Sequence, residues 1–227
     1  MPMAMRTITT TDHALMRLLQ LSSVSLPVGG YAFSQGLEYA IDSGWIHRAD
    51  QVADWLELQL LHAQAKTDLP LLKLAMQADS DGRWQSLNDL SLACRETREL
   101  RLTDGAMGEA LRRVLKNLGI DVPQVLQQEV SFIVLFAFAA KHWGLEFGAT
   151  ALGLGWSWLE NQVAAATKLV PLGQTQAQQL LNDLQPLLPQ AIEIAKSVEE
   201  DFIGAGLPAL AIASSRHETQ YSRLFRS

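Results

Sequence analysis

The stretch LRRVLKNLG (residues 111–119) carries the pattern that decides the fold class. Its leucines and its valine recur at intervals of three and four residues, which places them on one face of an α-helix. Gly119 follows directly, and glycine is the residue that most often ends a helix. The stretch therefore predicts an amphipathic helix that stops at Gly119.

The same helical spacing returns along most of the chain, whereas the alternation typical of β-strands is nearly absent. Thr10 and Thr11 precede the first apolar stripe as candidate N-caps. Apolar stripes, together with proline and glycine stops, predict further helices at about 50–60, 87–94, 123–142, 146–171, 177–184 and 191–202.

The breaks between these helices are short. The Pro- and Gly-rich stretches at 25–30, 185–190 and 204–208 read as connections within one domain and not as linkers. We therefore predict that residues 1–227 form a single all-α domain, a bundle of roughly eight to ten helices.

Composition excludes several functional classes. The net charge is −6 and the isoelectric point about 5.3, which argues against a general affinity for nucleic acid or anionic membranes. Cys94 is the single cysteine, which excludes an internal disulfide and fits a reducing compartment. The N-terminal residues lack a signal-peptide pattern, and the most apolar run, 132–140, is about half of what a membrane span needs. We expect a cytoplasmic protein.

No motif for catalysis, phosphate binding or metal binding survives inspection. The sequence GLGWSW (153–158) starts like a dinucleotide fingerprint but lacks the third glycine and a preceding strand. The five histidines are scattered, and none pairs with another at i,i+4. We therefore expect no enzyme activity, no catalytic residue, no cofactor and no metal site, and we favour a binding or scaffold role.

Two segments allow two interpretations each. In CRETRELR (94–101) three arginines alternate with glutamates, which indicates either a solvated face with an Arg95–Glu99 pair or a cluster that docks a partner and reaches its phosphate site. In EFGATALGLGW (146–156) small residues indicate either tight packing within the chain or a helical dimer seam.

The C-terminal stretch SSRHETQYSRLFRS (214–227) combines three arginines with two aromatic residues, an unusual composition for a chain end. If it is helical, Tyr221, Leu224 and Phe225 form one apolar stripe flanked by Arg216 and Arg223. Arginine and aromatic residues are typical of binding hot spots. We expect this segment to be a contact surface.

Four stretches together resemble the urease accessory protein UreF family: residues 19–46, 93–101, 155–181 and 208–227. They occur in the family order and extend over nearly the whole chain. The first contains YAFSQGLE, in which Ala32 replaces the small hydroxyl residue usual in the family.

The resemblance implies an all-α, homodimeric assembly factor without enzyme activity that helps to insert nickel into apo-urease. In such proteins the C-terminal segment binds UreD (also called UreH) and becomes ordered on binding, and this platform recruits the GTPase UreG. Carried over to this chain, the segment 208–227 would bind the partner. The implied partner-binding residues are Arg216, His217, Glu218, Thr219, Gln220, Tyr221, Ser222 and Arg223, together with Lys168 and Glu38.

A regulatory role is the alternative. An arginine of the 95–101 cluster could insert into UreG and change its GTPase activity. Neither interpretation requires this chain to bind nucleic acid or a membrane. In the free protein we expect the C-terminal segment to be either mobile or docked on its own core.

Overall fold

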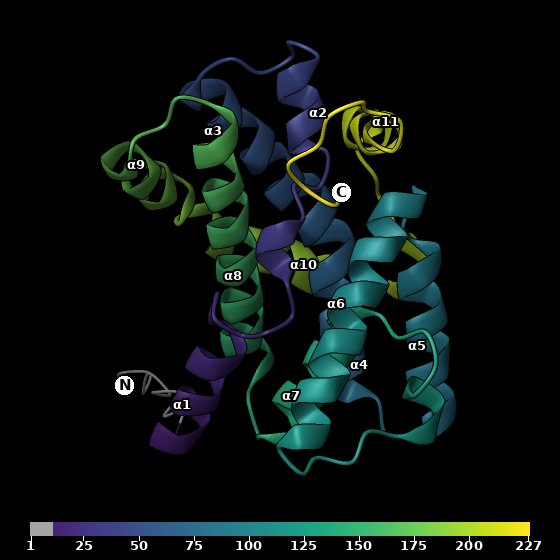
Figure 1. The fold of residues 1–227 in the computed structure, drawn as a ribbon. Coiled ribbons are helices and arrows are strands. Elements are labelled where there is room, and N and C mark those ends of the chain that lie inside the picture. Colours follow the sequence, from purple (N-terminus) through teal and green to yellow (C-terminus); the bar gives the residue numbers. More distant parts are fainter. Residues whose placement is uncertain (1–10) are drawn as a thin grey trace.

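The computed structural model describes residues 11–227, and this part of the chain folds into helices and connecting loops without any β-strand (Figure 1). Three of the helical segments, η1, η3 and η4, are single 3₁₀ turns, and η2 is a π-helix. The bounds are α1 (Asp12–Leu21), η1 (Gly30–Ala32), α2 (Leu37–Asp42), α3 (Ala49–Leu58), η2 (Gln59–Asp68), α4 (Leu69–Gln77), α5 (Asp81–Ala93), α6 (Arg98–Asn117), η3 (Gln124–Leu126), α7 (Phe132–His142), α8 (Phe147–Leu169), α9 (Gln174–Leu184), α10 (Leu187–Ser197), η4 (Glu200–Phe202) and α11 (Pro208–His217).

Helices α3, η2 and α4 follow one another without a gap, so they form one continuous rod. Eleven α-helices with two of them joined give ten separate helices in the described part of the chain. The prediction of an all-α domain with eight to ten helices is therefore confirmed. The N-cap prediction for Thr11 is confirmed too, since its side chain accepts a hydrogen bond from Ala14 N at 3.2 Å. Thr10 lies outside the described residues.

The core is built around α7, whose residues from Phe132 to Ala137 are all buried. Helices α4, α5 and α6 pack against it, so the helix contacts protein on nearly every side (Figure 1). This position explains why residues 132–140 are apolar without a polar face. In the described residues no helix is both long and apolar enough to cross a membrane.

The predicted start of α7 at Pro123 is wrong. Pro123 is followed by the short turn η3 and a loop, and α7 begins only at Phe132. Side chains from other helices supply the hydrogen bonds that a helix would have made here. Asn88 accepts from Ser131 N at 2.9 Å, and Asp104 accepts from Phe132 N at 3.0 Å.

The predicted helix at 191–202 is also shorter at its end, because α10 stops at Ser197 and Val198 is extended. Lys73 of α4 lies at this end and donates from Nζ to the carbonyl oxygens of Ala195, Lys196 and Val198 at 3.0 to 3.4 Å. A cation that satisfies the last carbonyls stabilises a helix terminus. This contact links α4 and α10, and the sequence of α10 alone does not indicate it.

The glycines of α8 allow two neighbouring helices to approach closely. A Cβ at Gly153 would lie 2.7 Å from Leu18 Cδ1 of α1, and a Cβ at Gly155 would lie 2.7 Å from Leu188 Cδ2 of α10. At these two positions the structure supports packing within the chain. Gly148 has no heavy atom within 4 Å of such a Cβ, so it takes no part in this packing.

Helix α8 extends along the molecule, with α1 beside its beginning and the C-terminal segment near its end (Figure 1). The segment after α11 passes close to α2 and returns toward the middle of the fold. Side chains from α2, α6, α8 and α11 therefore meet at this end of the molecule.

Candidate functional site

The C-terminal segment, residues 218–227, is not helical and lies docked on the body of the protein. At its end, Ser227 O accepts hydrogen bonds from Ser34 N at 2.5 Å, from Gln35 N at 3.1 Å and from Ser34 Oγ at 2.8 Å. Its hydroxyl lies 2.6 Å from that of Thr103, and Arg226 N donates to Ala32 O at 2.9 Å. Backbone and hydroxyl contacts therefore fix this end of the segment between η1, the loop before α2 and α6.

One aromatic residue anchors the segment in the core. Phe225 is buried, and Lys168 of α8 places its ammonium 5.5 Å from the centre of the Phe225 ring, within the range of a cation–π contact. Tyr221 is fully exposed, and Leu224 is 72% exposed. The predicted stripe of Tyr221, Leu224 and Phe225 is wrong because α11 ends at His217 and the chain beyond it bends, so that Phe225 is buried while Tyr221 and Leu224 are exposed.

Three buried titratable side chains and one partly exposed arginine hold the middle of the segment. The carboxylate of Glu38 accepts from Leu224 N at 2.6 Å through Oε1 and from Phe225 N at 2.9 Å through Oε2. His217 Nε2 lies 3.0 Å from Glu38 Oε2, and His217 Nδ1 lies 2.9 Å from Glu99 Oε2. Arg223 Nη1 donates to Glu99 Oε1 at 3.3 Å. We call Glu38, His217, Glu99 and Arg223 the clasp.

Within the clasp, burial changes the pKa of the Glu99 carboxyl. Burial is the largest influence on Glu99 and raises the pKa of its carboxyl, while His217 and Arg223 act in the opposite direction. The net pKa lies above the ordinary value, so a proton is held more tightly here than on an exposed glutamate.

Gly36 lets α2 approach α11 closely enough for the clasp to form. It precedes α2 with a φ of +82°, a conformation that favours glycine. A Cβ at this position would lie 3.2 Å from Ala213 Cβ and 3.3 Å from Ser214 N of α11. On the other side, Thr97 Oγ1 at the N-cap of α6 lies 2.7 Å from Ser214 Oγ. These contacts bring Glu38 and Glu99 to opposite sides of His217.

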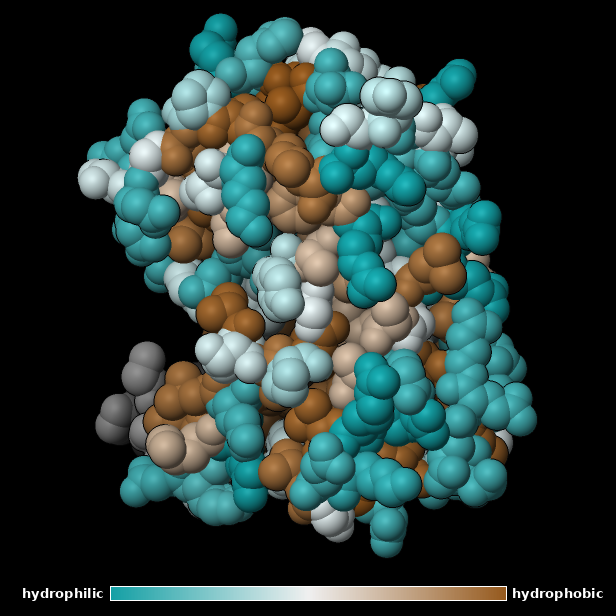
Figure 2. Space-filling model, in the orientation of Figure 1, coloured by the Kyte–Doolittle hydropathy of each residue, from teal (hydrophilic) through white to brown (hydrophobic). Residues whose placement is uncertain are grey.

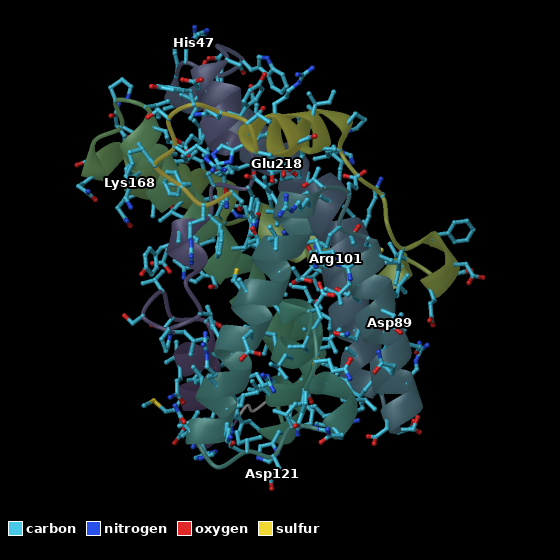
Figure 3. All side chains as sticks on the ribbon, turned by 45° about the vertical axis from the view of Figure 1, so that its right-hand side comes forward. His47, Asp89, Arg101, Asp121, Lys168 and Glu218 are labelled. Carbon is cyan, nitrogen blue, oxygen red and sulfur yellow. The ribbon has the colours of Figure 1, made fainter. Side chains whose placement is uncertain are left out.

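The structure divides the predicted site residues into two groups. Glu38 and His217 are buried, and the protein itself surrounds them. The other predicted residues are exposed or partly exposed, and Figure 3 shows Glu218 and Lys168 at the same end of the molecule. The exposed or partly exposed group consists of Lys168, Arg216, Glu218, Thr219, Gln220, Tyr221, Ser222 and Arg223.

Sequence reasoning missed Glu99, Ser34 and Thr103, although Ser34 and Glu99 lie within the quoted family-like stretches. Their partners are more than 100 residues away, since Glu99 contacts His217 and Ser34 contacts Ser227. Spacing along one helix cannot indicate such pairs. Only the family-like motifs, which contain Ser34 and Glu99, gave any signal.

The arginine cluster of residues 94–101 is not one continuous helical face. Arg95 lies in the turn between α5 and α6, so the predicted Arg95–Glu99 helical pair is wrong. Instead, Arg95 Nη2 lies 2.7 Å from Asp68 Oδ1, and Arg95 Nε lies 3.3 Å from Asp104 Oδ2 without hydrogen-bond alignment. Arg101, labelled in Figure 3, is exposed and forms a two-point pair with Glu129.

Burial alone would lower the pKa of Arg95, but the carboxylates of Asp104 and Asp68 outweigh it and keep the guanidinium charged. These three side chains border a cavity of about 120 Å³ between η2, α6 and α8, whose walls also include Gln59, Trp158 and Cys94. Burial raises the pKa of the Cys94 thiol, which makes it a weak nucleophile. Within residues 11–227 no three His, Cys, Asp or Glu side chains lie together as metal ligands would.

A family model and individual relatives of known name both match this chain, and they point to the same family. The model of the UreF family matches residues 46–185, which is more than half of the chain. The urease accessory protein UreF of Marinomonas sp. (strain MWYL1) is 61% identical over 223 residues, which is 97% of each chain. The proteins of the same name from Alkalilimnicola ehrlichii (44% over 233 residues) and Teredinibacter turnerae (46% over 225 residues) match 98% and 95% of this chain and the whole of theirs.

Proposed function

Since this chain belongs to the urease accessory protein UreF family, we propose that it is a non-enzymatic scaffold for urease maturation. In this role it bridges UreD (UreH) and the GTPase UreG to apo-urease during nickel insertion. Nickel is the cargo of the assembly and not a resident cofactor of this chain. We place the assembly in the cytoplasm, in keeping with the single, free cysteine.

The observation that carries the proposal is the exposed apolar part of the C-terminal segment. Tyr221 and Leu224 project from a stretch whose neighbours Phe225 and Ser227 are fixed in the body of the protein. A large side chain held in place by its neighbours loses little conformational entropy when it binds. Exposed aromatic residues beside arginines are the usual centres of protein interfaces.

We propose that UreD contacts the exposed side chains of this segment directly. These are Glu218, Thr219, Gln220, Tyr221, Ser222 and Arg223, together with Arg216 of α11 and with Lys168 of α8 at the edge of the surface. Glu38 and His217 lie beneath the surface and take part by holding the segment in position. The domain thus consists of a helical body and a partner-binding segment that includes α11 and residues 218–227.

Co-expression of this chain with UreD tests the proposal. We expect the double variant Tyr221→Ala/Leu224→Ala to lose co-purification with UreD while its far-ultraviolet circular dichroism stays unchanged. Phe202→Ala is the matched control because Phe202 is 73% exposed on η4, outside this segment. Retention of UreD by the double variant, or equal loss in the control, would overturn the assignment of this surface.

The alternative function is regulation of the GTPase activity of UreG by an arginine of the 95–101 cluster. Two of the three arginines in this cluster are accessible to a partner. The side chain of Arg95 lies between two aspartates and is only 14% exposed, whereas Arg98 and Arg101 are exposed. GTP turnover by UreG should be measured with the native chain and with Arg98→Ala and Arg101→Ala. A large effect of the native chain that one of these changes abolishes would favour regulation, while unchanged turnover favours the scaffold.

We further propose that the chain forms a homodimer through the outer face of α1. Leu15, Met16 and Leu19 are exposed there, while Leu18 and Ser22 pack inward near Gly153. Figure 2 shows hydrophobic side chains over α1. Three exposed apolar side chains on one helix face can pack against the identical set of a second chain across a two-fold axis.

A further inference from the structure

The imidazole of His217 lies fully buried between two carboxyl groups from different helices. Nε2 is 3.0 Å from Glu38 Oε2 of α2, and Nδ1 is 2.9 Å from Glu99 Oε2 of α6. Both distances are those of ordinary hydrogen bonds. Each ring nitrogen therefore faces an oxygen that can accept a proton.

Two such contacts require two protons. A neutral imidazole carries one N–H and two ionised carboxylates carry none, so one contact would bring two lone pairs together. The clasp must therefore hold a second proton, either on the ring of His217 or on one of the carboxyl groups. The number of protons is the same in both cases, so the conclusion does not depend on which atom carries the second proton.

This second proton is connected to the C-terminal segment by direct contacts. Oε2 of Glu38, which faces His217, also accepts the backbone N–H of Phe225, and Oε1 of the same carboxylate accepts the N–H of Leu224. On the opposite side, Arg223 donates to the carboxylate of Glu99. Both neighbours of the ring thus bind the segment that Tyr221 and Leu224 project from.

We propose that His217 is a positioning residue, which holds the C-terminal segment on the protein only while the clasp keeps its second proton. When rising pH removes this proton, the segment is released. That the docked segment is the form presented to UreD rests on the proposed function, whereas the docking itself is a property of this chain alone.

The charges around the ring determine the direction of the effect. Glu38 faces it from α2 and Glu99 from α6, and Arg223 and Glu218 approach Glu99 from the C-terminal segment. With the second proton, the charges of Glu38, Glu99, His217 and Arg223 sum to zero. Without it, two buried carboxylates face one neutral ring, and Glu218 adds to the negative charge.

The docked state therefore binds one more proton than the released state, so docking is favoured at low pH and lost as pH rises. The raised pKa of Glu99 acts in the same direction, because burial makes the folded protein hold a proton that the exposed group would release. Lys168 lies over the ring of Phe225 and makes no contact with the imidazole of His217. Its contact with Phe225 therefore does not depend on the second proton of the clasp.

Two substitutions that preserve shape should have opposite effects. In Glu99→Gln the amide oxygen can keep the contact to Arg223 while the amide N–H₂ donates to Nδ1 of a neutral ring, so no second titratable proton is needed. In Glu38→Gln an N–H₂ group would face the N–H groups of Leu224 or Phe225, so the segment loses an acceptor at every pH.

Trypsin cleavage after Arg223, followed by mass spectrometry on the full chain between pH 6 and pH 9, tests the inference. Rates are divided by those of Glu99→Gln at the same pH, which removes the pH dependence of trypsin itself. We expect the native ratio to rise on the order of tenfold across the range, because a buried contact loses its proton. Glu38→Gln should be cleaved rapidly throughout.

Nitrogen NMR of the His217 ring and of the Leu224 and Phe225 amides supplies a second readout. We expect the ring and amide signals to change at the same pH in the native chain, and the amides of Glu99→Gln to stay constant. Identical pH profiles for the native chain and Glu99→Gln would overturn the inference, as would a ring titration that leaves the amides unchanged. If the segment is released with rising pH as expected but co-purification with UreD does not change with pH, the assignment of UreD as the partner is wrong and the inference about the clasp is unaffected.

Discussion

At the scale of single residues, replacing Arg95 should destabilise the fold strongly. Its guanidinium is the cation beside the buried carboxylates of Asp68 and Asp104. Arg95→Met preserves much of the volume but leaves two buried negative charges without a partner. We expect it to lower the free energy of unfolding by about 3 to 5 kcal/mol, measured by urea denaturation near pH 7.

Arg98→Met is the matched control, because Arg98 is exposed and has no ion pair within the described residues. Its effect on the free energy of unfolding should stay within about 0.5 kcal/mol.

The pH dependence of the Arg95→Met effect gives a further check. Burial raises the pKa of Asp104, and a group with a raised folded pKa loses its stabilising contribution as pH rises. The loss caused by Arg95→Met should therefore be smaller near pH 5 than near pH 8, and an equal loss at both would contradict this account.

The same residues show where local sequence reasoning ends. The spacing of Arg95 and Glu99 predicts an ion pair on one helix, yet each contacts a residue far away in the chain. Glu99 contacts His217, which is 118 positions away. Which buried charge meets which depends on how helices cross, and the sequence of one helix contains no information about that crossing.

At the scale of elements, the sequence predicts a helix end well when the capping or stop residue lies beside that end in the chain. It does not predict an end that is set by hydrogen bonds from side chains of other helices. Thr11 caps α1 through its own side chain, and α8 ends at Leu169, two residues before Pro171. By contrast, the start of α7 depends on Asn88 and Asp104 from α5 and α6. A capping residue can be seen in sequence only when it lies next to the helix it caps.

The approach of α2 to α11 gives an element-scale prediction that concerns Gly36. A substitution to alanine there combines a positive φ with contacts to Ala213 and Ser214. Gly119 has a similar φ of +74°, but a Cβ added there would meet no heavy atom within 4 Å, so Gly119→Ala isolates the cost of the backbone conformation. That cost is about 1 to 2 kcal/mol.

We expect Gly36→Ala to be more destabilising than Gly119→Ala, because α2 must also move away from α11. Since Glu38 moves with α2, cleavage by trypsin after Arg223 should accelerate only in Gly36→Ala. Thermal unfolding and the cleavage rate measure the two effects separately. Equal stability of the two variants, with equal protection of Arg223, would mean that the packing of α2 on α11 is not what positions the clasp.

At the scale of the whole molecule, the helical body presents two different surfaces at opposite ends. The C-terminal segment lies near the end of α8, and α1 lies beside its beginning (Figure 1). The sequence predicted the first surface from composition and resemblance. It suggested a dimer seam on the glycines of α8, but two of these pack against α1 and α10 of the same chain, which leaves the outer face of α1 as the better candidate.

Self-association through α1 is tested by a charge placed on its outer face. Leu15 and Leu19 lie one turn apart and are 46% and 59% exposed. Across a two-fold axis a single Leu19→Glu change introduces two like charges into one apolar contact, whose desolvation and repulsion both oppose association. Light scattering at micromolar concentration should give the native chain about twice its mass of 25.0 kDa and Leu19→Glu about the single mass. Leu118→Glu, at a 43% exposed position beyond α6, should keep the native mass. The outer face of α1 is excluded as the dimer surface if Leu19→Glu and Leu118→Glu both keep the dimer mass, or if both have the mass of a single chain.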